Sequence, residues 1–311
     1  MCFLCARLPS KVLHGGQAFA TWRGSSSKTG VGCMTRLIYY ELVKTFLKKR
    51  TYIGFLLVAI VVPLVQVAMK IEGGRFLTYS LRSLQQDFLF VGNLFNGWFV
   101  AQSMMNSLWV HIPLLISFVA GDQLAGEATA GTYRLILVRP VSRTRIFLAK
   151  YITTSLYTLS FVFFMAFLST GLALILLGSG DLIILQRGIL ILPESDVAWR
   201  FLAGYVLAFW AMLTIASIAF FFSAFVENAI GPIISTMGLN MIFFLVTVLP
   251  LEFFKTMKPY LFTNYLNIWQ KVFEDPVPWQ EIGTSSLVLG AYSAVFVLAA
   301  WFIFRRKDIL T

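Results

Sequence analysis

Three polar side chains within one apolar stretch, Gln102, Asn106 and His111, are the first candidates for chemistry. Amide and imidazole groups at membrane depth usually bond to other helices or line a path for a polar substrate. At 100° per residue Gln102 and Asn106 share a helical face, whereas His111 falls elsewhere on the helix. The spacing therefore favours interhelical hydrogen bonds, and an intramembrane polar path is the alternative.

Catalytic and cofactor motifs are absent from the sequence. It has no Gly-x-x-x-x-Gly-Lys-Ser/Thr phosphate loop, no His-Glu-x-x-His zinc motif and no Gly-x-Ser-x-Gly nucleophile elbow. The three cysteines, Cys2, Cys5 and Cys33, precede every apolar stretch, so they support no disulfide framework or metal cluster. We expect no catalytic residue, no metal site and no cofactor bound by this chain.

The densest pattern lies in a charged segment, residues 126–150, which read GEATAGTYRLILVRPVSRTRIFLAK. A first short helix is predicted to stop at Pro140, because proline disfavours helical geometry at the residue before it. Ser142 is then positioned as the N-cap of a second helix, with Arg143 in its first turn. A cation there opposes the helix dipole, so we expect a lipid phosphate or a partner protein to offset it.

This segment resembles the signature of the permease subunits of type-2 ATP-binding-cassette (ABC) transporters, most of which are bacterial exporters. The shared pattern is Glu-x-x-x-Gly-Thr-x-Arg-x-x-Leu-x-x-Pro-Val-Ser-Arg, followed by an aliphatic run and Ala-Lys. The matching positions are Glu127, Gly131, Thr132, Arg134, Leu137, Pro140, Val141, Ser142, Arg143, Ala149 and Lys150. The overall layout extends the resemblance to residues 34–311.

The resemblance implies a role for the segment and a set of partners. In that family it is the coupling helix that rests on a separate ATPase subunit. The implied coupling positions are Glu127, Gly131, Thr132, Arg134, Arg139, Pro140, Val141, Ser142 and Arg143. The chain would pair with a second permease, either a copy or a paralogue, while ATP and Mg²⁺ would bind to the ATPase. A lipid-bound loop without a protein partner is the simpler alternative.

The composition requires lipid as the solvent for much of the chain. Of 311 residues 58% are hydrophobic and 13% are charged, whereas globular proteins have about 25% charged residues. Six stretches have the ~17–25 residues needed to cross ~30 Å of hydrocarbon. They are residues 52–69, 98–120, 146–177, 201–225, 229–249 and 287–304. Pro63 and Pro113 fall inside two of them and are interpreted as kinks. The predicted fold is an all-α membrane protein with six transmembrane helices.

The distribution of Lys and Arg predicts the orientation. One set of segments holds 17 Lys and Arg against 5 Asp and Glu, and it consists of residues 1–51, 121–150, 226–228 and 305–311. The other set holds 8 Lys and Arg against 9 Asp and Glu, and it consists of residues 70–97, 178–200 and 250–286. Because cytoplasmic segments near spans retain positive charge, we expect both termini in the cytoplasm and the chain in the plasma (inner) membrane. Topology and contact with anionic lipid account for the net charge of +11, so no nucleic-acid partner is expected.

One permease domain is expected over residues 34–311. Residues 1–33 lack the apolar core of a signal peptide and are predicted to be disordered or to precede the true start of the protein. Residues 34–50 form an amphipathic helix, expected to lie in the membrane plane, and its apolar face carries Tyr39, Leu42, Val43 and Phe46. The resemblance implies that residues 121–145 form the cytoplasmic coupling loop, and the aromatic-rich segment 250–286 is expected to form an extracytoplasmic interfacial loop.

Small residues predict two helix-packing seams. One seam follows Gly204, Ala208 and Ala211; the other follows Gly231, Ser235 and Gly238.

Two other functions stay open. An ATPase-independent channel or carrier would use His111 and the asparagines of the second span. An accessory membrane protein of an immunity or assembly system is the other alternative. The spans do not indicate a transported substrate.

Overall fold

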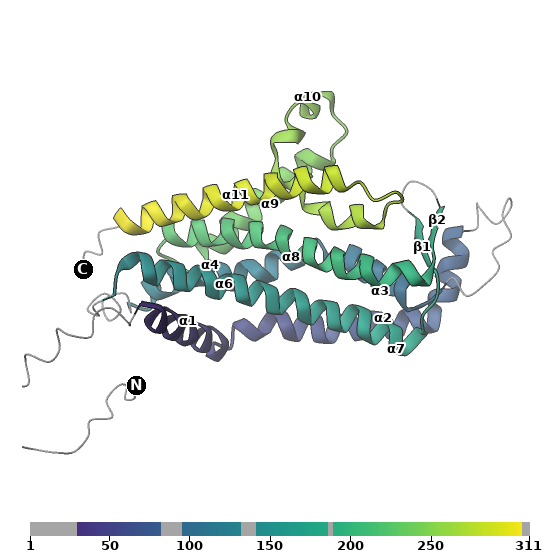
Figure 1. Cartoon of the computed structure of the whole chain (residues 1–311), viewed down its shortest axis with the longest axis horizontal. Coiled ribbons are helices and arrows are strands. Elements are labelled where there is room, and N and C mark those ends of the chain that lie inside the picture. The colour runs from purple at the N-terminus through teal and green to yellow at the C-terminus, as the bar shows by residue number, and fades with distance from the viewer. Residues whose placement is uncertain (1–29, 82–94, 132–140, 186–188, 307–311) are drawn as a thin grey trace, which may run out of the picture.

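The computed structural model describes residues 30–81, 95–131, 141–185 and 189–306, and these form an elongated bundle of helices (Figure 1). Its main helices are α2 (Thr51–Leu81), α6 (Arg143–Ala166), α8 (Glu194–Phe225), α9 (Gly231–Val248) and α11 (Trp279–Arg306). Helix α1 (Gly30–Leu47) lies at one end, here called the α1 end, with the start of α6 and the last turns of α11. Helix α1 begins before Met34, so the predicted extension is helical over its last four residues; residues 1–29 lie outside the described part.

The structure confirms a mostly helical membrane protein. In the described part five helices are long and apolar enough to cross a membrane, and there are six if the bent pair of α3 (Gly97–Leu108) and α4 (Ile112–Thr129) is one span. Large apolar side chains on their outer surfaces are exposed, such as Ile175 at 81% and Leu202 at 70%. Such surfaces suit contact with lipid acyl chains and not with water. This is the architecture of a multi-pass membrane protein.

The second predicted span is broken into two helices. Helix α3 ends at Leu108, α4 begins at Ile112, and the two are bent by 54°. Pro113 lies in the first turn of α4, where its missing N–H would have no partner within the helix anyway. Our interpretation of Pro113 as a kink was therefore wrong, because it marks a helix start. Pro63 does lie inside a helix, α2.

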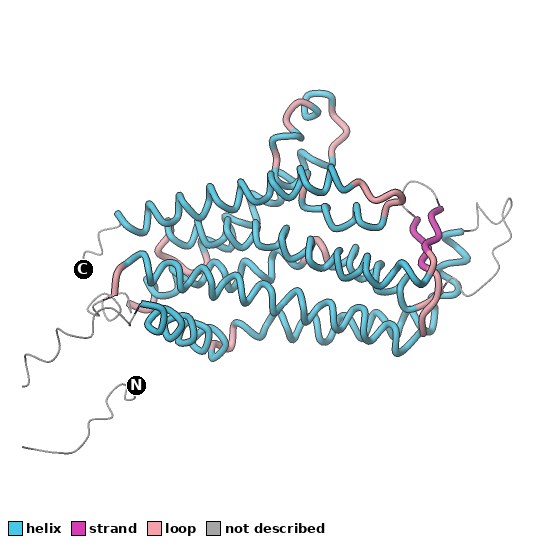
Figure 2. The backbone as a smooth tube through the Cα atoms, viewed as in Figure 1, coloured by secondary structure: helices cyan, strands magenta, loops and turns pink. Residues whose placement is uncertain are grey.

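Two further elements differ from the expected layout. Helix α6 continues through a π-helical segment, η2 (Phe167–Leu172), into α7 (Ala173–Leu177). An antiparallel hairpin of β1 (Leu182–Leu185) and β2 (Ile189–Leu192) then covers the end of the bundle opposite α1 (Figure 2). The all-α prediction missed this hairpin. Its Leu and Ile runs are short, and Gly178, Gly180 and Pro193 bound them, which favours strands over helix.

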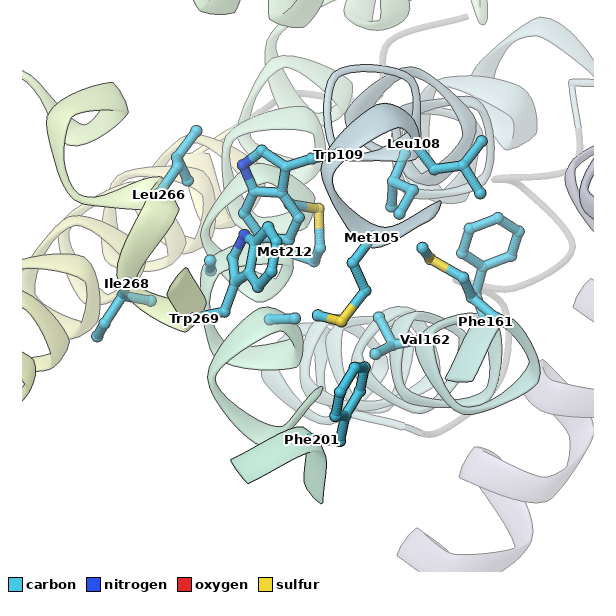
Figure 3. Packing of buried hydrophobic residues seen from close by; sticks show 14 of the residues in the cluster. Met105, Leu108, Trp109, Phe161, Val162, Phe201, Met212, Leu266, Ile268 and Trp269 are labelled. Atoms are coloured by element: carbon cyan, nitrogen blue, oxygen red, sulfur yellow. The ribbon is translucent and has the colours of Figure 1, made fainter. Parts of the chain in front are cut away.

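The predicted outer loop is shorter than expected and is partly buried. It contains α10 (Glu252–Lys255) and three 3₁₀ segments, η3 (Lys258–Tyr260), η4 (Phe262–Asn264) and η5 (Leu266–Phe273), and α11 starts at Trp279, within the predicted loop 250–286. Trp269 of η5 is fully buried and packs on Trp109 beside Met105 and Met212 (Figure 3). An interfacial loop therefore describes only part of this segment, because η5 belongs to the core.

Candidate functional site

A buried lysine joins three helices at the α1 end. Lys150 lies about 10 Å along α6 from its first residue, and its side chain is only 1% exposed. Its ammonium donates to Glu41 Oε2 of α1 at 2.9 Å and also to Glu127 Oε1 of α4. Lys44 of α1 donates to the same Glu127 oxygen. We call Glu41, Lys44, Glu127 and Lys150 the ion-pair cluster.

The ion-pair cluster is balanced, with two carboxylates and two ammonium groups. Removing a charge from water costs several kcal/mol, so buried charges persist only where they are paired and hydrogen-bonded. Glu127 is 2% exposed and Glu41 is 8% exposed, so both depend on these cations for solvation. The cluster therefore ties α1, α4 and α6 into one unit.

The sequence of α1 places two members of the cluster on one helical face. Glu41, Lys44 and Thr45 have the i, i+3 and i+4 spacing that puts side chains side by side. This polar face points into the bundle, whereas Tyr39 and Leu47 are 64% and 78% exposed. A helix in water would have the opposite arrangement. An outward apolar face suits contact with lipid.

Hydroxyl and amide groups hold α4 in place around the cluster. Gln123 donates to Thr45 Oγ1 at 3.1 Å, which adds a second link between α4 and α1. Ser223 of α8 accepts from the backbone N–H groups of Leu124 and Ala125 at 3.0 and 2.9 Å. Thr129 donates to the carbonyl of Glu227 at 3.0 Å, which links the end of α4 to the turn after α8. The helix that leads into the signature segment is thus fixed on two sides.

The predicted coupling residues fall on both sides of a gap in the described chain. Glu127 is on α4 and Gly131 follows it with φ of +63°, a left-handed conformation that suits glycine after a helix. Val141 and Ser142 precede α6, and Ser142 is its N-cap as predicted. Thr132, Arg134, Arg139 and Pro140, in residues 132–140, lie outside the described part.

Two features of these residues were not predicted from the sequence. Glu127 is buried, because α1 covers its carboxylate. Arg143, for which we expect a lipid phosphate or a partner protein, also has a contact within the chain, since its Nη1 donates to the carbonyl oxygen of Arg305 at 3.3 Å. This oxygen lies in the last turn of α11, where the helix dipole is negative. The chain itself thus supplies a favourable contact for Arg143.

The three intramembrane candidates do not form one polar stripe. Gln102 is buried, whereas Asn106 and His111 are exposed. Asn106 Oδ1 accepts from Gln270 of η5 at 2.8 Å, and His111 Nδ1 lies 3.1 Å from the carbonyl of Ser107. An interhelical bond therefore exists at Asn106, with a partner that the sequence analysis had not identified. Within the described ranges, no cluster of His, Cys, Asp and Glu could hold a metal ion.

Glu41, Lys44 and Lys150 were not predicted as site residues. Lys150 was part of the signature but was given no role of its own. A lysine two turns into an apolar helix was the available signal, because such a charge needs a buried partner. The partners could not be named from the sequence, since they come from helices 23 and 109 residues away.

Comparisons with known proteins give a family but no activity. The model of the family described as "Protein of unknown function (DUF2705)" matches residues 44–310. The "Uncharacterized protein YhcI" of Bacillus subtilis (strain 168) is 30% identical over an alignment of 209 residues, and the match covers 63% of this chain and 64% of that protein. The match therefore spans slightly less than two thirds of the relative's length. Because the family model covers nearly the whole described chain, this protein belongs to the DUF2705 family of proteins of unknown function.

Proposed function

We propose that this chain is the permease subunit of an ATP-driven ABC transporter, an exporter with both termini on the cytoplasmic side of the plasma membrane. One observation carries the proposal. The two described ends of the signature, at Gly131 and Val141, directly adjoin α4 and α6, which share the buried ion-pair cluster. A motor subunit that moves the segment between them would therefore act on α1, α4 and α6 together.

The charge of the α1 end supports its placement in the cytoplasm. Arg143, Arg145, Arg305 and Arg306 gather there at the ends of α6 and α11 (Figure 1). Positive charge beside membrane spans is retained on the cytoplasmic side. An ATPase that binds ATP and Mg²⁺ would meet this face, and α1 would lie along the membrane surface with its apolar side in lipid.

The break between α3 and α4 offers a place for movement. Packed helices shift as rigid bodies instead of deforming continuously. Helix α4 is fixed to α1, α6 and α8 at the α1 end, whereas residues 109–111 separate it from α3 at the bend. Displacement of the α1 end would change this bend and reorient Asn106 and His111, which lie beside it. An ATPase-independent channel would use the same two residues, and it would conduct without an ATPase.

A second permease would pack on α9. The seam at Gly204 is filled within this chain, since a Cβ there would lie 3.3 Å from the ring of Phe273. By contrast, a Cβ at Gly238 would meet no heavy atom within 4 Å, and Ile234 and Met241 nearby are 65% and 67% exposed. Small residues beside exposed apolar ones allow close helix approach in lipid. This face of α9 is our candidate contact with the second copy or paralogue.

Coupling is tested with the exposed Arg145 at the start of α6. We expect Arg145→Glu to weaken binding of the proposed partner, an ABC ATPase co-expressed with this chain, by about tenfold, because it reverses a charge on the proposed docking face. The measurement is the ATPase retained by the tagged permease in detergent, together with the ATPase activity of the complex.

Lys70→Glu is the matched control for Arg145→Glu, because Lys70 is an exposed cation far along α2. The control should retain the ATPase at the wild-type level. Failure of the wild-type chain to retain the ATPase, or equal retention by both variants, would contradict the docking proposal. Solute flux through the purified chain without any ATPase would favour a channel instead.

A further inference from the structure

A basic pocket lies at the turn between α1 and α2. Lys48, Lys49, Arg50, Asp122 and Gly126 line it. Three cations therefore surround one carboxylate, and the pocket has a net positive charge. It adjoins the ion-pair cluster along α1 and α4 but shares none of its residues.

The carboxylate forms the floor of the pocket and the cations form its open rim. Asp122 Oδ2 lies 2.6 Å from Lys48 Nζ, and Asp122 Oδ1 lies 3.6 Å from Arg50 Nη1. The Asp122 side chain is 12% exposed, whereas that of Arg50 is 72% exposed. A Cβ at residue 126 would overlap the Asp122 carboxylate, so Gly126 gives that carboxylate room to lie against α4. The pocket thus holds its cations in place while leaving their outer sides free for an anion.

Apolar surfaces border the pocket on both sides. Helix α1, which precedes it, exposes Tyr39 and Leu47, and α2, which follows it, exposes Tyr52 and Leu56. A free anion would make no use of such surfaces. A phospholipid would use both, since its phosphate can bond to the cations while its acyl chains lie along α2. Exposed tyrosines are common at this depth, where headgroups meet hydrocarbon.

We propose that this pocket binds the phosphate of an anionic phospholipid, with Lys49 and Arg50 as its main donors. Lys48 and Asp122 hold the turn in the conformation that presents those donors. The bound lipid would fix the junction of α1 and α2 at the membrane surface. This assignment is independent of the proposed ATPase, because it needs only the chain and a lipid.

The test measures lipid binding to the purified full chain. Native mass spectrometry in dodecyl maltoside would count phosphatidylglycerol and phosphatidylcholine molecules retained during titration with each lipid. We expect the wild-type chain to prefer phosphatidylglycerol and the Lys49→Gln, Arg50→Gln double variant to bind it about 30-fold more weakly, since each cation near a headgroup contributes several-fold. Lys70→Gln, which removes a cation elsewhere on α2, should bind phosphatidylglycerol as the wild type does.

Three outcomes would overturn the proposal. One is equal retention of the two lipids by the wild-type chain, and another is unchanged phosphatidylglycerol binding by the double variant. The third is displacement of the lipid by inorganic phosphate at equal concentration, which would assign the pocket to a free anion. Both substituted side chains are exposed, so the double variant should have the same melting temperature as the wild type. If the double variant melts at a lower temperature than the wild type, Lys49→Gln alone is compared with Lys70→Gln. The proposal then requires Lys49→Gln to bind phosphatidylglycerol more weakly than Lys70→Gln does.

Discussion

Replacing Lys150 with Met is expected to lower the free energy of unfolding by about 3–5 kcal/mol, the usual effect of removing one partner from a buried ion pair. Met has a similar volume but leaves Glu41 and Glu127 without their shared cation. The melting temperature in detergent, followed by tryptophan fluorescence, should fall by about 10 °C. The loss should affect α1, α4 and α6 together, because the lysine touches side chains of the other two helices.

The control for Lys150→Met is Lys70→Met, which changes an exposed lysine to the same residue and should leave the melting temperature unchanged. A rescue variant sharpens the test. Adding Glu41→Gln and Glu127→Gln to Lys150→Met should recover part of the loss, because no unpaired charge then remains among the three sites. Equal melting temperatures for Lys150→Met and the wild type would show that Lys150 is not buried among carboxylates.

Gly97→Ala is expected to destabilise the opposite end of the bundle by about 3 kcal/mol, at the upper end of typical overpacking costs. A Cβ at this position would lie 2.7 Å from the carbonyl oxygens of Ala173 and Gly178 and 2.8 Å from the Cα of Leu174. All three are backbone atoms of α7 and its end, so no side-chain rotation can make room. The amide of Gly97 also donates to the Gly178 carbonyl at 2.8 Å, which holds α3 against α7. Melting temperature and yield of folded protein measure the effect.

The matched substitution is Gly283→Ala on α11, where an added Cβ meets no heavy atom within 4 Å. In a helix this change is expected to be neutral or to stabilise by up to about 1 kcal/mol. The same melting temperature for Gly97→Ala and Gly283→Ala would contradict the described approach of α3 to α7.

Most spans could be predicted because length and hydropathy are local properties of a sequence. The stretches expected at 52–69, 201–225 and 229–249 fall within or close to α2, α8 and α9. The break near Pro113 could not be predicted with equal certainty. Proline is compatible with a kinked membrane helix and with the first turn of a new one, and only packing against neighbouring elements decides between them.

The chemistry of the α1 end depends on tertiary contacts. The polar face of α1 was evident from residue spacing, but its inward direction was not. Glu127 is buried because α1 packs against α4 and α6. The contact of Arg143 with α11 joins residues that are 162 positions apart in the sequence. Pairings over such separations leave no pattern in a single sequence. The sequence therefore shows which residue types lie at this end, whereas only the structure shows which of them are paired.

We propose above all that the α1 end faces the cytoplasm, where a motor subunit reaches it. A single cysteine at Arg145, in a chain whose native cysteines are replaced by serine, tests this with a membrane-impermeant maleimide. We predict that Arg145→Cys is labelled in inverted membrane vesicles and not in intact cells. A Lys258→Cys variant should be labelled in intact cells and not in inverted vesicles. Labelling of position 145 in intact cells would place the signature segment outside the cell and contradict the account.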